Sequence, residues 1–384
     1  MRNSIYILFI MCSVLALCSS CNVDVELEKN EHPHRSVVQF QYDWRNNSPI
    51  PDSMYVIAYR VVNRYEYRYV TGAKATGNGC RLVLPAEEFE GISGKTAKLR
   101  AGEYEITAFN LYQESNAEPF FDPASSKDSV YMSYPIVSKI TDSPLLSRYT
   151  NWIDSNPYSG FLICEEKPMY AGVTKLNVDK ENKKALDCKI TPKILNQKVN
   201  VVFTIAPKEE GIMIDSVHAE MSGVCSVIYP FTGAVDITKT GKVLYYPTCT
   251  PSTSSAKSNV TVKGSFYGTG IVRAASPMLT MGPGILQVNV HVHMIENGKL
   301  YKKVFRANIN LYNTLVKNPS LVLNEDKTKF TISSPEITLT LGNTLKLTRN
   351  KVLADIESGT DCWYEGGEVY VEIFEDETQE VIGY

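Results

Sequence analysis

The chain has 384 residues, 43% of them hydrophobic, and a formal net charge of −3 at pH 7. This length is too great for one ordinary hydrophobic core and predicts two domains. The weak negative charge argues against nucleic acid as a partner, because nucleic-acid-binding proteins favour a concentrated basic face.

The first twenty residues have the layout of a bacterial lipoprotein signal. Arg2 supplies a positive charge, an apolar run covers 5–17, and the small residues Ser19 and Ser20 precede Cys21. A membrane-spanning helix needs about 20 apolar residues, so a retained transmembrane anchor is not expected. We predict that residues 1–20 are a signal peptide and that Cys21 carries the lipid. An ordinary secretory signal cleaved near Ser20 is the alternative.

Residues 21–34 are short, acidic and end in His32-Pro33-His34. We predict that they tether the first domain to the lipid at Cys21, although alternating Val and Leu would also let them pair as an edge strand.

Strand patterns dominate 35–178, which we predict to be the first domain. Val38, Phe40, Tyr42 and Trp44 alternate with polar residues, the period-two pattern of a half-buried strand. Further strands are predicted at 54–62, 65–69, 81–84 and 103–109, and a short helix at 142–154.

A charged, turn-rich stretch at 179–184 indicates a break at 178–192, and we predict a second domain over 193–384. Asn297-Gly298 is a strong hairpin signal. The second domain's strands are predicted at 199–205, 216–221, 243–246, 260–264, 286–294, 302–311, 337–341 and 369–374. Short alternating strands with almost no helical periodicity predict an all-β fold of two tandem antiparallel β-sandwiches.

Several segments resemble the fimbrillin-associated anchor proteins and related surface lipoproteins of Bacteroidota. They are 34–40 with Asp43-Trp44, 51–59, 99–106, 168–172, 221–224, 267–269 and 366–369. The resemblance rests on turn glycines and strand patterning. It implies two transthyretin-like β-sandwiches behind a lipidated cysteine, and a role as a pilus anchor, assembly factor or minor pilus component.

The same resemblance implies partners and a location. Pilin subunits would join by strand addition, in which an extended segment of one chain completes a sheet edge of the next. The membrane would be bound through the lipid on Cys21. Asp24, Glu26 and Glu28 resemble the acidic tract that directs Bacteroidota lipoproteins outward, which implies an outer-membrane, surface-exposed protein.

The sequence leaves two questions about strand addition undecided: the role of the last segment, and the position of any cleavage site. The last segment, 369–381, is a donor strand, a docking edge or, as we favour, the last strand of its own sheet. Major subunits of the related family are thought to be cleaved after arginine. Arg45 and Arg100 lie between predicted strands, and nothing in the sequence marks either as a cleavage site.

The six cysteines after the signal show no C-x-x-C spacing, so neither a zinc knuckle nor a redox pair is indicated. An oxidising compartment would permit disulfides, and burial as small hydrophobic residues is equally consistent. They are Cys80, Cys164, Cys188, Cys225, Cys249 and Cys362.

Two further groups of residues could form ligand sites. His291 and His293 share one strand face and could hold a metal, but Gln287 and Asn289 share it too, which favours a wet or lightly covered polar face. Aromatic side chains could stack sugars, although burial is the commoner outcome. These are Tyr65, Tyr67, Tyr69, Trp152 and Trp363. No metal or cofactor is therefore predicted.

No nucleophile elbow, H-E-x-x-H motif or P-loop is present, and Gly282-Pro283-Gly284 is a turn that opens no helix. We therefore predict a non-enzymatic, lipid-anchored surface protein that acts as a pilus anchor or minor adhesion component. The alternative is a glycan-binding surface lipoprotein of a polysaccharide-uptake system.

Overall fold

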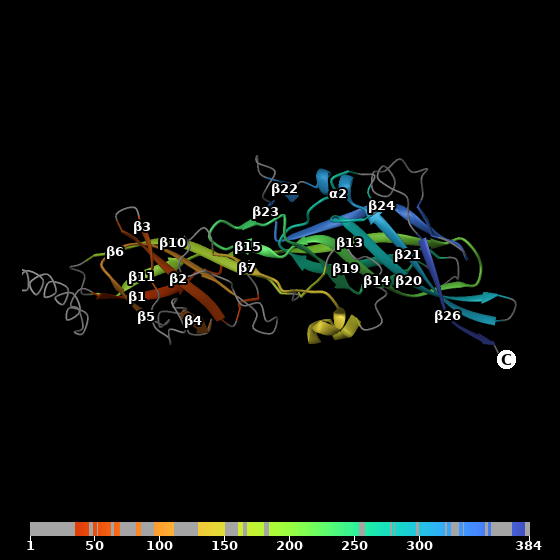
Figure 1. Ribbon diagram of the computed structural model, residues 1–384, viewed down its shortest axis with the longest axis horizontal. Helices are drawn as coiled ribbons and strands as arrows, with labels where there is room; N and C mark the ends of the chain where they lie inside the picture. The colour runs from red at the N-terminus through yellow and green to blue at the C-terminus, as the bar shows by residue number, and fades with distance from the viewer. Residues whose placement is uncertain are drawn as a thin grey trace, which may run out of the picture.

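The protein is described by a computed structural model in which nearly every regular element is a β-strand (Figure 1). The helical elements described are two 3₁₀ helices, η5 (Ile140–Asp142) and η6 (Pro144–Tyr149), and one α-helix, α2 (Tyr312–Lys317). The structure describes residues 35–45, 49–51, 53–62, 65–69, 82–85, 96–110, 130–149, 160–163, 167–179, 184–252, 258–276, 279, 281–296, 299–318, 321–323, 330–332, 334–349, 352–354 and 371–380.

Two sheets form the N-terminal lobe. The smaller has the order β11-β1-β5, made of β1 (Arg35–Tyr42), β5 (Thr96–Arg100) and β11 (Leu186–Ile190). The larger has the order β12-β10-β6-β2-β3, with β4 also paired to β2. Its strands are β2 (Ser53–Val62), β3 (Tyr65–Tyr69), β4 (Leu82–Pro85), β6 (Gly102–Phe109), β10 (Tyr170–Val178) and β12 (Lys193–Ile194).

The core of this lobe lies between the two sheets. Val38 and Phe40 of β1 pack with Val56 of β2 and Tyr104 and Ile106 of β6, all of them buried. The period-two pattern of β1 therefore buries its apolar face as predicted.

The C-terminal lobe is also built on two large sheets. The five-stranded sheet has the order β18-β19-β13-β24-β25. Its strands are β13 (Gln197–Pro207), β18 (Thr248–Pro251), β19 (Val260–Gly268), β24 (Glu336–Leu347) and β25 (Val352–Ala354). The seven-stranded sheet has the order β26-β21-β20-β14-β17-β9-β8. Its strands are β8 (Ile136–Val137), β9 (Phe161–Leu162), β14 (Ile212–Cys225), β17 (Thr240–Tyr245), β20 (Ile285–Glu296), β21 (Lys299–Asn310) and β26 (Val371–Glu380).

The apolar faces of these sheets meet in the main core. Val201 and Phe203 of β13 belong to one buried cluster with Val288 and Val290 of β20. The all-β prediction is confirmed. The pairing is mainly antiparallel, but β1–β11, β13–β24 and β9–β17 are parallel pairs.

Strand pairing crosses the ranges expected for the two domains. β11 lies inside the expected break and pairs with β1, so the turn-rich part of this stretch is shorter than predicted. β7 (Met132–Ser133), from the expected first domain, pairs with β15 (Val227–Tyr229), which also pairs with β16 (Ala234–Val235). β9 likewise pairs with β17. β7 and β9 are too short for their periodicity to predict which sheet they join, and both pair with strands of the C-terminal lobe.

The two lobes share buried contacts. Ile57, Tyr59 and Phe109 of the N-terminal lobe belong to the same buried cluster as the C-terminal core. The ring of Tyr59 meets that of Phe231 edge-on, with centroids 5.3 Å apart. Figure 1 shows β1 and β2 toward one end of the long axis and β20, β21 and β26 toward the other.

Two local predictions have definite outcomes. Glu296 pairs with Lys299, so β20 and β21 form the hairpin that Asn297-Gly298 indicated, although those two residues lie outside the described ones. The helix predicted at 142–154 is instead the 3₁₀ helix η6 as far as Tyr149, and the rest lies outside the described residues. The two-stranded sheet of β22 (Leu321–Leu323) and β23 (Phe330–Ile332) completes the described fold.

Gly223 shows why a turn glycine is needed in this fold. It has φ +77° in the irregular part of β14, and a Cβ there would lie 2.6 Å from the nitrogen of Gly284 and 2.7 Å from the carbonyl oxygen of Val272. Only glycine meets both demands without strain.

Candidate functional site

The seven-stranded sheet ends in the last described strand of the chain, β26. It pairs antiparallel with β21, and no described strand pairs with its other side. The last segment therefore belongs to its own sheet, as we favoured, and is also a sheet edge.

The register between β26 and β21 is complementary in charge. Four glutamates of β26 stand opposite basic residues of β21: Glu372 opposite Arg306, Glu375 opposite Lys303, Glu377 opposite Lys302 and Glu380 opposite Lys299. Opposite charges directly across a ladder contribute roughly 0.2–1 kcal/mol each. The register skips Asp376, where the ladder is irregular.

A groove of about 630 Å³ lies on the outer face of the five-stranded sheet. Its floor is formed by outward-facing side chains of β13, β19 and β24, because the alternate residues of these strands fill the core. They are Asn200, Val202, Lys263, Ser265, Glu336 and Thr338.

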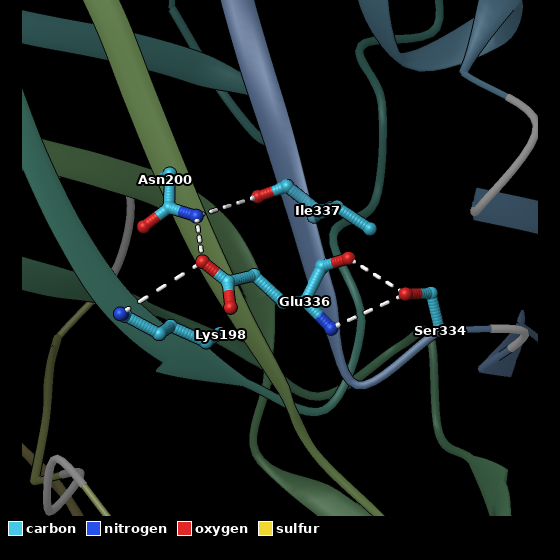
Figure 2. Close-up of polar contacts among 5 residues, drawn as sticks. All are labelled: Lys198, Asn200, Ser334, Glu336 and Ile337. Atoms are coloured by element: carbon cyan, nitrogen blue, oxygen red, sulfur yellow. Dashed lines mark hydrogen bonds and ion pairs between the residues drawn. The ribbon is translucent and has the colours of Figure 1, made fainter.

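Glu336 and Asn200 hold each other in place on this floor (Figure 2). The Asn200 side-chain amide donates to Glu336 Oε1 at 2.6 Å and to the carbonyl of Ile337 at 3.4 Å. Lys198 Nζ lies 3.8 Å from the same carboxylate oxygen. The Ser334 hydroxyl donates to the Glu336 carbonyl at 2.8 Å, which fixes the start of β24. The negative charge of Glu336 is thus compensated within the protein.

Tyrosines form one wall of the groove. The rings of Tyr149 and Tyr246 stack with centroids 4.8 Å apart and an interplanar angle of 26°. Tyr149 is buried and donates its hydroxyl to the Leu244 carbonyl at 2.8 Å, whereas Tyr246 is 42% exposed and donates to the Arg148 carbonyl at 2.7 Å. These bonds attach η6 to the end of β17 and hold the wall in one orientation.

Gly264 lets the base of the groove close. A Cβ at this position would lie 2.6 Å from Cε2 of the buried Tyr245 ring. Because Gly264 has no side chain, the ring can lie flat against the β19 backbone.

The outer face of the seven-stranded sheet was expected to be wet or lightly covered. It is half-buried at His291 and His293 and fully buried farther along β20, where that expectation is wrong. Gln287 and Asn289 are each 1% exposed. Arg306, fully buried, donates from Nε to Asn289 Oδ1 at 3.2 Å. Lys242 and Glu220 form a buried ion pair with Nζ 3.9 Å from Oε1. The local pattern does not predict this burial, because the burial arises from tertiary packing between distant segments.

Over β17, next to Glu220, this face is covered by η6 and β9. Leu146, Tyr149, Phe161 and Ile163 form a small apolar cluster with Leu244 of β17. The Lys242 ammonium lies 4.5 Å from the centroid of the Phe161 ring. The cover thus places an aromatic ring against the buried cation.

The two histidines considered as a metal pair have separate partners. The His291 ring packs against His218, with centroids 4.3 Å apart, and His218 meets Tyr246 at 4.6 Å. His293 Nδ1 contacts the Asp215 carboxylate. Burial, with a smaller contribution from His291, lowers the pKa of His218 from 6.5 to about 4. Within the part of the chain that the structure describes, no three His, Cys, Asp or Glu residues are grouped to hold a metal ion.

The described cysteines carry free thiols. Burial raises the pKa of both Cys188 and Cys225 to about 12, which makes them unreactive small hydrophobic residues. Cys249 is partly buried and free. Cys80, Cys164 and Cys362 lie outside the described residues.

Other predicted residues have mixed outcomes. Arg45 is exposed and bonds to Asp43 at 3.1 Å, whereas Arg100 ends β5 and is not between strands. Cys21, the tether 21–34, Trp152 and Trp363 lie outside the described residues, as do the side chains of Tyr65, Tyr67 and Tyr69. Among the residues that are described, no helix has the length and apolarity to cross a bilayer.

No protein-family model and no curated protein matches the chain. Solved structures with a similar arrangement include a candidate adhesin from Bacteroides ovatus, at 13% identity and a TM-score of 0.43, covering 82% of this chain and 92% of that one. The fimbrial anchor protein Mfa2 from Porphyromonas gingivalis matches at 11% identity and a TM-score of 0.38, covering 87% and 98%. A fimbrial assembly protein from Parabacteroides distasonis matches at 13% identity and a TM-score of 0.29, covering 88% and 99%.

Proposed function

We propose that this chain is a non-enzymatic surface lipoprotein, held at the outer membrane by a lipid on Cys21, which serves as a pilus anchor or minor pilus component. It would join a partner subunit by β-strand addition. The observation that carries the proposal is the position of β26 at the edge of the seven-stranded sheet.

An edge strand presents a row of unpaired backbone N–H and C=O groups. β26 has ten residues, so the side that pairs with no described strand offers roughly 33 Å of ladder at ~3.3 Å per residue. A partner segment in extended conformation would gain main-chain hydrogen bonds along this length. Four opposite-charge register pairs oppose removal of β26 from β21, so β26 is assigned as the acceptor strand and not as the donor.

The middle of β26 restricts which strand can pair. Glu375, Asp376 and Glu377 follow one another, and charge on an edge strand discourages indiscriminate pairing. Like charges directly opposite each other are unfavourable, so the partner strand should carry lysine or arginine opposite this segment.

Two adjacent proline variants test the acceptor edge. In an antiparallel ladder, neighbouring residues direct their N–H groups to opposite sides. One of Thr378→Pro and Gln379→Pro should therefore break bonds to β21 and lower stability. The other should leave the unfolding midpoint nearly unchanged and abolish capture of pilin subunits of the same organism. Full capture by the stable variant would overturn strand addition at β26.

Anchoring is tested separately. Cys21→Ala should move the protein from the membrane fraction to the soluble one, and retention in the membrane would contradict lipidation at Cys21. Deletion of the gene should detach or shorten pili. Normal pili and no captured subunit would rule out the pilus role.

A further inference from the structure

We propose that the groove on the outer face of β13, β19 and β24 is a binding site for an acidic oligosaccharide. This is a separate activity from strand addition. The groove floor is a sheet face, and β13 is already paired with β19 on one side and β24 on the other. The floor therefore has no free ladder to offer a strand, and recognition there depends on side chains.

The floor carries polar side chains at regular positions around Val202. The register places Asn200 between Ser265 of β19 and Thr338 of β24, and Val202 between Lys263 and Thr340. Neighbouring strands are about 4.8 Å apart and same-face residues about 6.6 Å apart along a strand. Hydroxyl and amide groups both donate and accept hydrogen bonds, as sugar hydroxyls do. An array of such groups on one flat surface suits a polyhydroxylated ligand.

Tyr246 supplies the apolar surface that a sugar ring needs. It is 42% exposed at the groove, its ring stacks on Tyr149 and meets His218 edge-on, and its hydroxyl is fixed to the Arg148 carbonyl at 2.7 Å. An aromatic ring already held in place loses little conformational entropy on binding. It can pack against the C–H face of a sugar while the floor bonds its hydroxyls.

The charge of the groove points to an acidic sugar. Glu336 is compensated by Lys198 and by the amide of Asn200. Lys263 is exposed at the groove, and no acidic partner for it is found among the described residues. A carboxylate on the ligand would form a charge-assisted hydrogen bond with this ammonium group. The volume of about 630 Å³ is within the usual range for small-ligand sites.

Calorimetric titration of the full chain with short oligogalacturonates tests the proposal, with neutral galactose oligomers of equal length as the comparison. The acidic oligomer should bind more tightly. Lys263→Gln should weaken that binding by about tenfold, because one charge-assisted hydrogen bond is lost. Lys189→Gln removes a charge from an exposed site on β11 and is the matched control that should change nothing.

Variants at Asn200 and Tyr246 distinguish the contributions of the polar floor and the aromatic wall from that of the Lys263 charge. Asn200→Ala should weaken both acidic and neutral oligomers, and Tyr246→Ala should do so more than Tyr246→Phe, which keeps the ring. No heat of binding with either oligomer would overturn the proposal. Equal losses from Lys263→Gln and Lys189→Gln would indicate nonspecific attraction and would also overturn it. Pilin capture is unaffected by the groove variants if strand addition occurs at β26, so the two proposals fail independently.

Discussion

Lys242 and Glu220 form an ion pair inside the C-terminal lobe, with 0% and 1% of their side chains exposed and 3.9 Å between Nζ and Oε1. They lie on neighbouring strands, β17 and β14, under the apolar cluster of η6 and β9. Two charges are therefore shielded from water in part by elements that precede both strands in the chain.

Removing one member of this pair should be costly. Lys242→Met leaves the Glu220 carboxylate buried without its cation, and we expect a loss of about 3–5 kcal/mol in the free energy of unfolding. The double variant Lys242→Met with Glu220→Leu should lose markedly less. Urea denaturation of the three proteins measures this. A single variant as stable as the parent would show that the pair is solvated.

The groove depends on the absence of a side chain at residue 264. Gly264→Ala should lower the free energy of unfolding by about 1–3 kcal/mol, because its Cβ would overlap the Tyr245 ring. Gly233→Ala is a control with positive φ but no atom within 4 Å of the new Cβ, and it should cost only about 1–2 kcal/mol of backbone strain. Ligand binding also distinguishes the two variants, because only Gly264→Ala should change the affinity of the groove.

Stability should fall on mild acidification because of His218. The pKa of His218 is about 4 in the folded protein, compared with an ordinary value of 6.5. The unfolded chain therefore binds a proton at this residue more readily. The contribution of neutral His218 is fully present above pH 6.5 and is lost progressively as pH falls toward 4. The groups facing it are His291 and Tyr246. His218→Gln should flatten the stability curve between pH 4 and 6.5, and an unchanged slope would contradict this origin.

Charge reversal tests the register of the last strand. Lys302→Glu places two negative charges opposite each other at Glu377 and should lower the hydrogen-exchange protection of β26. Adding Glu377→Lys restores opposite charges in the reversed order and should recover protection. Lys189→Glu is the control on another sheet. Equal protection in all variants would show that backbone pairing alone sets the register.

Much of the fold could be predicted locally. The alternation of Val199, Val201, Phe203 and Ile205 predicts a strand with one buried face, and β13 buries that face. The Asn297-Gly298 signal predicts the hairpin of β20 and β21. These predictions succeed because period-two patterning and turn chemistry act between residues close together in the chain.

The candidate site could not be predicted in this way. Asn200 and Glu336 are 136 residues apart, and Tyr246 and Arg148 are 98 apart, and no motif connects them. The polar face with Gln287 and Asn289 was expected to be wet or lightly covered, and both side chains are buried by tertiary packing that no local pattern reveals.

The sequence by itself determined the all-β class, the strand faces and the hairpin, because these follow from the alternation of apolar and polar residues. The lipoprotein signal ending at Cys21 is likewise predicted from residue order, and it stays a prediction. Only the tertiary structure decided which strand lies at an edge, which polar face is covered and which side chains line the groove. These properties depend on pairing between distant segments, and many alternative pairings satisfy the same local pattern.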